Sequence, residues 1–88
     1  MDQPKRIRCN NINYRKGFIE VFPGIHPGFI NLETWDIHPD VDISERNLSD
    51  DSIPDDAVVS NSEIEMSVKE AEELVQLLQD AISEVKSQ

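Results

Sequence analysis

The sequence has a single cysteine, Cys9, so it cannot form an internal disulfide. A fold that needs no disulfide suits a reducing compartment, and we expect a cytoplasmic location. Long hydrophobic runs are also missing: no stretch approaches the roughly 20 consecutive apolar residues that a membrane-spanning helix needs. The charged start has no apolar run behind it, unlike a secretory signal. We therefore expect neither secretion nor a membrane partner.

Glycine is scarce, and Gly17, Gly24 and Gly28 form no phosphate-binding loop. Both histidines precede a proline, and neither lies near a nucleophile motif. Cys9 could act as a nucleophile only if a histidine reached it, so we expect it to be structural. A chain of 88 residues has room for one small domain and little room for an interior catalytic cleft. We expect a protein that is not an enzyme and that needs no cofactor.

One segment carries potential metal ligands at alternate positions: Asp36, His38, Asp40 and Asp42. In an extended strand they would project on one side. Pro39 interrupts that geometry, the spacing matches no known ligand set, and exposed oxygen ligands bind divalent ions weakly. A calcium loop beginning at Asp40 also fails, because Glu45 occupies the position that requires glycine. We expect no metal site.

Basic residues are few: eight Lys and Arg against eighteen Asp and Glu give a formal net charge of -10. The charges are unevenly placed. Residues 1–16 carry five basic residues and one acid, whereas residues 33–65 carry eleven acids and one arginine. A chain of this balance repels nucleic acid, so no direct nucleic-acid binding is expected. Closely spaced carboxylates can instead imitate a phosphate backbone and occupy a basic groove of another protein.

The clearest element is an amphipathic helix over residues 67–86. Ser67 and Glu70 have the spacing of a capping box at its start. Apolar residues recur three and four positions apart along one face, at Ala71, Leu74, Val75, Leu78, Ala81, Ile82 and Val85. We expect this face to pack in the core, with the neighbouring Leu77 as a candidate dimer contact.

Residues 7–43 read as a β-rich part that follows a flexible leader at residues 1–6. The alternation over residues 7–22 predicts a hairpin, whose tight turn would lie at residues 15–17 with Gly17 at positive φ. Two Pro-Gly steps predict a turn after Phe22.

The next segment, residues 29–36, reads as a third strand. Residues 41–43 could extend it or form a short further strand. An acidic loop at residues 44–56 and a short strand or hairpin at residues 57–66 complete a single domain spanning residues 1–88.

These elements predict an α+β fold: a small antiparallel sheet of about four short strands with one C-terminal amphipathic helix packed on one face. One helix cannot cover both faces of a sheet. The other face is left for a partner or for a second copy of the chain.

The charge map predicts a non-enzymatic acidic protein-binding domain. It would be an inhibitor or adaptor that docks on a basic surface of a larger protein, for example one that handles nucleic acid, as phage or mobile-element anti-defence factors do. The alternatives are a homo-oligomeric structural or regulatory subunit, hence a possible homodimer, and an immunity protein to a basic toxin nuclease. The predicted partner-binding residues, with the tryptophan as an apolar anchor, are Glu33, Trp35, Asp36, Asp40, Asp42, Glu45, Asp50, Asp51, Asp55 and Asp56.

Overall fold

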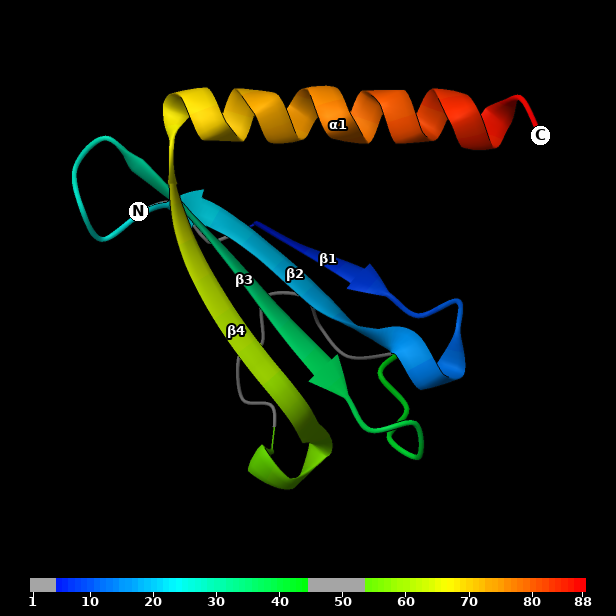
Figure 1. The fold of residues 1–88 in the computed structure, drawn as a ribbon. Coiled ribbons are helices and arrows are strands. Elements are labelled where there is room, and N and C mark those ends of the chain that lie inside the picture. Colours follow the sequence, from blue (N-terminus) through cyan, green and yellow to red (C-terminus); the bar gives the residue numbers. More distant parts are fainter. Residues whose placement is uncertain (1–4, 45–53) are drawn as a thin grey trace.

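The computed structural model describes residues 5–44 and 54–88. Its strands and helix are β1 (Lys5–Cys9), β2 (Lys16–Pro23), β3 (Phe29–Ile37), β4 (Val58–Ser67) and α1 (Val68–Lys86). Two short 3-10 turns lie at Asn13–Arg15 and Asp55–Ala57. The strands form one antiparallel sheet in the order β1-β2-β3-β4, and α1 follows the last strand (Figure 1). The predicted α+β arrangement is confirmed.

The predicted first hairpin is present, but its turn lies elsewhere than expected. The strands pair from Lys5 opposite Val21 to Cys9 opposite Gly17, so the connection occupies residues 10–15 and Gly17 lies inside β2. Among the described residues only Gly28 has a positive φ. A Cβ at Gly17 would lie 1.8 Å from the carbonyl oxygen of Trp35. Glycine is therefore needed there for close approach of β2 and β3, not for a turn.

The strands β3 and β4 form the longest pairing in the sheet. A hydrogen bond of 2.7 Å from the Gly24 amide to the Phe29 carbonyl closes the proline-glycine turn between β2 and β3. The segment before the helix is one continuous strand of ten residues, so the hairpin alternative is wrong. No strand forms at residues 41–43. Instead, the chain there folds back, and Ile43 is fully buried.

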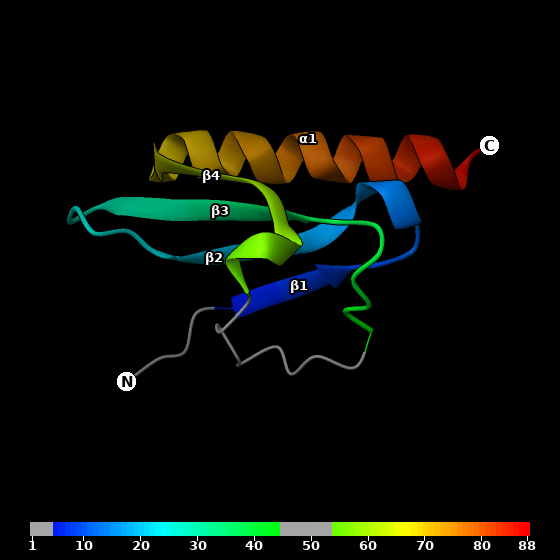
Figure 2. The ribbon, with the colours of Figure 1, turned by 90° about the horizontal axis from the view of Figure 1, so that it is seen from below.

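The two faces of the sheet differ in what covers them. The loop face, which carries Phe18, holds the small core: Phe18, Ile37 and Ile43 pack together, and Val41 lies against them. Figure 2 shows the segment at residues 38–44 and α1 on opposite sides of the sheet. The opposite face, which we call the open sheet face, carries apolar side chains from all four strands: Ile7, Ile19, Val21, Ile30, Leu32, Ile64 and Met66.

The loop face also contains a buried ion pair. The Arg6 Nη2 atom lies 2.6 Å from the Glu20 Oε1 atom, with side-chain exposures of 6% and 8%. The Arg6 guanidinium carbon lies 4.9 Å from the centre of the Trp35 ring and 5.7 Å from that of Phe18. Two aromatic faces and one carboxylate thus surround the guanidinium, the type of environment in which a buried arginine is stable.

The helix starts as predicted. The Ser67 Oγ atom accepts from the Glu70 amide at 3.1 Å, and the Glu70 carboxylate accepts from the Ser67 amide at 2.9 Å. The helix then packs only weakly on the sheet, chiefly against β4 and β3.

No residue of α1 is buried, which corrects the expectation that its apolar face is part of the core. The reason is geometric. Because Ser67 is both the last residue of β4 and the helix cap, no connecting residue lets the helix turn back over the sheet. The strands instead run obliquely away from it (Figure 1).

Candidate protein-binding surfaces

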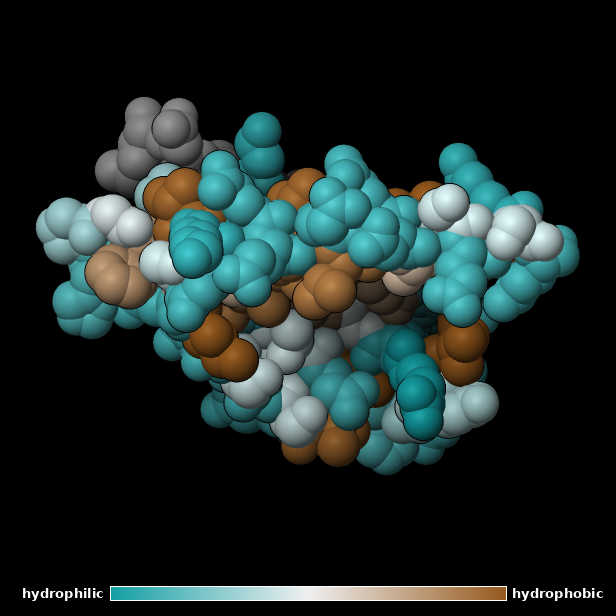
Figure 3. All heavy atoms as spheres, turned by 45° about the horizontal axis from the view of Figure 1, so that its top comes forward, coloured by the Kyte–Doolittle hydropathy of each residue, from teal (hydrophilic) through white to brown (hydrophobic). Residues whose placement is uncertain are grey.

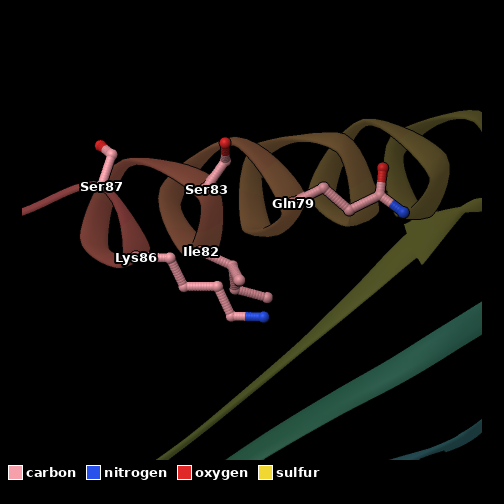
Figure 4. A pocket seen from close by; sticks show the side chains of 5 residues that line it. All are labelled: Gln79, Ile82, Ser83, Lys86 and Ser87. Atoms are coloured by element: carbon pink, nitrogen blue, oxygen red, sulfur yellow. The ribbon is translucent and has the colours of Figure 1, made fainter.

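The largest unpaired apolar feature is on α1. Its side chains Val75, Leu78, Ile82 and Val85 are 52% to 63% exposed, and with the partly buried Leu74 they form what we call the helix stripe. Figure 4 shows Ile82 and Lys86 on the side of the helix that faces the strands, with Ser83 and Ser87 turned away. An amphipathic helix gains most of its stability from burial of such a stripe.

The helix stripe and the open sheet face border the same hollow, which we call the recess. In Figure 3, hydrophobic atoms follow the lower edge of α1 and continue into the hollow beneath it, while hydrophilic atoms cover the outer side. On the sheet, Ile7 and Ile64 remain 58% and 61% exposed. Exposed apolar side chains that border one hollow are typical of a surface that another polypeptide covers.

A depression of about 180 Å³ lies mostly over β1 and β2 and reaches β3. Its lining includes Cys9, Gly17, Ile19 and Thr34, with Arg15 at the rim. Because Gly17 has no side chain, it leaves a hollow between the neighbouring strands. A shallow groove also runs along the C-terminal half of α1, but it is lined by helix residues alone (Figure 4).

Four predicted site residues, Asp40, Asp42, Asp55 and Asp56, gather at one end of the sheet, which we call the acidic end. A bond of 2.8 Å from the His38 amide to the Ala57 carbonyl joins the two segments that carry them. All four side chains are exposed. The Ser44 amide and hydroxyl donate to Asp42 at 2.9 and 2.7 Å, which lowers the pKa of that carboxyl and keeps it ionised.

The remaining predicted residues do not form one surface with the acidic end. Glu33 and Trp35 point to the loop face, where the Glu33 carboxylate accepts from Asn61 and the indole packs against the core. Asp36 is exposed on the other face. Three further predicted residues, Glu45, Asp50 and Asp51, lie outside the described residues. The binding role of the whole set stays a prediction.

An uncovered sheet face was expected on the side away from the helix, but the open sheet face lies on the same side as α1. The sequence did not reveal a row of glutamates on the loop face, where Glu33 pairs with Glu20 on one side and with Glu63 on the other. No local pattern reveals such a row, because its members are far apart in the chain.

The remaining chemistry is sparse. Over residues 5–44 and 54–88, no group of three or more His, Cys, Asp or Glu side chains is arranged to hold a metal ion. No helix in that part of the chain is long and apolar enough to cross a membrane. Comparison of the chain with protein-family models, with curated proteins and with solved structures gave no match.

Proposed function

We propose that this chain is a non-enzymatic protein-binding domain whose recess is covered by another polypeptide. The observation that carries the proposal is the exposed helix stripe, which faces an apolar sheet surface but packs only weakly against it. At about 25 cal/mol per Å² of apolar surface, covering such a recess is strongly favourable. A polypeptide that fills the recess therefore has an ample driving force for binding.

The acidic end supports a second part of the proposal: the domain acts as an inhibitor or adaptor on a partner with a basic surface. Asp40, Asp42, Asp55 and Asp56 are exposed together, and the net charge of the chain is -10. Carboxylates grouped in this way attract a basic groove and can compete there with a phosphate backbone. This role suits a factor that blocks a nucleic-acid-handling protein, such as an anti-defence factor or an immunity protein.

Affinity capture tests the first part of the proposal. The chain, a variant with Leu78→Glu and Ile82→Glu in the helix stripe, and a control with Ser83→Glu on the outer side of α1 are each immobilised and exposed to a lysate of the source organism. We expect wild type and control to retain the same protein, and the stripe variant to lose it because a charge cannot be desolvated in an apolar contact. Equal capture by all three would contradict a role for the helix stripe.

A further inference from the structure

We propose, on the basis of the proposed function, that the polypeptide in the recess is a second copy of this chain. In this arrangement α1 of each copy lies across the β1–β2 half of the other's open sheet face. Each copy would give its helix and receive that of its partner, so the interface is two-fold symmetric.

The chain carries both surfaces of an ordinary helix-on-sheet core, but the two pack only weakly against each other. Its own helix lies chiefly against β4 and β3. On the other half of the sheet, Ile7 is 58% and Val21 38% exposed. The stripe from Leu74 to Val85 is about 17 Å long, which is more than enough to cross β1 and β2, since paired strands lie about 5 Å apart. Reciprocal packing buries both surfaces.

The charges of α1 and of the β1 side of the sheet are opposite in sign. Lys5 and Arg15 are exposed at the β1 side of the sheet. The other basic residues of this region, Arg6, Arg8 and Lys16, point to the loop face. The helix is acidic, with Glu70, Glu72, Glu73, Asp80 and Glu84 against two lysines. Opposite charges thus favour the β1 side of a second copy.

The depression at Gly17 offers a site for an anchor side chain. It lies mostly over β1 and β2 and reaches β3, and Cys9, Ile19 and Thr34 line it. A helix crossing the β1–β2 half can place a large apolar side chain in the hollow. A side chain that enters a fitted pocket is a typical anchor of a specific interface.

Sedimentation equilibrium over a wide concentration range measures whether the copies associate. We expect a dimer for wild type and for the control Ser83→Glu, and a dissociation constant raised at least about thirtyfold by Leu78→Glu with Ile82→Glu, as for other interface anchors. Lys5→Glu should weaken the dimer by a few-fold, and less so at high salt.

Thiol crosslinking tests the arrangement, because Cys9 on β1 is the only native cysteine. A chain with Cys9→Ser and Ile82→Cys is mixed with wild type, so that a crosslink between residues 9 and 82 must join two copies. We expect this mixed dimer with a short bis-maleimide. A crosslink between two copies of the Ile82→Cys chain in its place would overturn the arrangement, as would a chain that stays monomeric at all concentrations.

The two proposals fail separately. If the chain is monomeric but the helix stripe still captures another protein, the second copy is wrong and the binding domain stands. If the chain neither associates with itself nor captures a protein through the stripe, both proposals are wrong.

Discussion

At the scale of residues, the least replaceable position is Gly17. The missing Cβ allows the backbone of β2 to approach the Trp35 carbonyl, and any Cβ would meet that oxygen at 1.8 Å. We expect Gly17→Ala to destabilise the fold by about 2 to 3 kcal/mol, because backbone must move on both strands. Urea unfolding measures the change.

A matched control for that experiment is Gly28→Asn. Gly28 has a φ of 85°, and a Cβ added there would have no neighbouring atom within 4 Å. Asparagine also tolerates left-handed backbone better than other residues. This change should cost about 1 kcal/mol or less. A larger loss from Gly28→Asn than from Gly17→Ala would contradict the close approach as the reason for Gly17.

The pairing of Arg6 with Glu20 gives a second prediction at this scale. Arg6→Met leaves the Glu20 carboxylate buried without its cation, so we expect a loss of about 3 kcal/mol in unfolding free energy. The double variant Arg6→Met with Glu20→Gln removes both charges and should recover more than half of that loss. A double variant as unstable as the single one would show that the packing of Arg6 on Trp35 matters more than the ion pair.

The pair His26 and Glu65 gives a pH prediction. The His26 ring nitrogen, 2.8 Å from the Glu65 carboxylate, and then the His26 amide lower the pKa of Glu65 below its ordinary value. A carboxyl with a lowered pKa contributes stability above its unfolded pKa, about 4.3, and loses it as the pH falls through the folded value. Glu65→Gln should therefore reduce stability at neutral pH and flatten its decline below about pH 4.5. Thermal unfolding across this range measures both effects.

At the scale of elements, α1 depends on its cap more than a packed helix does. Few tertiary contacts hold it, so loss of the capping box is not compensated by the sheet. We expect Ser67→Ala to lower helix stability by about 1 kcal/mol and to reduce the helical circular dichroism signal most at low protein concentration. An unchanged signal in the monomer would mean that the helix has stabilising contacts beyond those described.

The elements also show how far the sequence could predict the fold. The start of α1 at Ser67 was predictable because capping depends on neighbours within four residues. The turn of the first hairpin was not, because the need for Gly17 arises from Trp35, eighteen positions away in the chain. Amphipathicity indicated that the helix stripe must be buried, but it contains no information on whether the covering surface belongs to the same chain.

The candidate site was also predictable only in part from the sequence. Asp40 and Asp42 were expected at the end of the β-rich part and Asp55 and Asp56 in the acidic loop that follows, and the structure places all four at one end of the sheet. Glu33 and Asp36 were grouped with them from proximity in sequence, yet they lie on opposite faces because an odd number of steps along a strand changes the face. The register was needed to separate them.

At the scale of the whole molecule, the recess and the acidic end are separate surfaces. Neutralising the acidic end with Asp40→Asn, Asp42→Asn, Asp55→Asn and Asp56→Asn should weaken binding to a basic partner and reduce its salt dependence. It should leave self-association unchanged, because these side chains lie away from the helix stripe. Binding titrations at two salt concentrations and sedimentation of the same variant measure the two properties. A variant that lost both would show that the surfaces are coupled.

The junction at Ser67 couples two periodicities. In β4 the side chains alternate every two residues, and in α1 they rotate by about 100° per residue. Because α1 begins directly after β4, with no residue between them, the alternation of side chains in β4 determines the direction in which the helix stripe points. One residue inserted after Ser67 would turn the stripe by about 100° and point it away from the recess without altering a single apolar side chain.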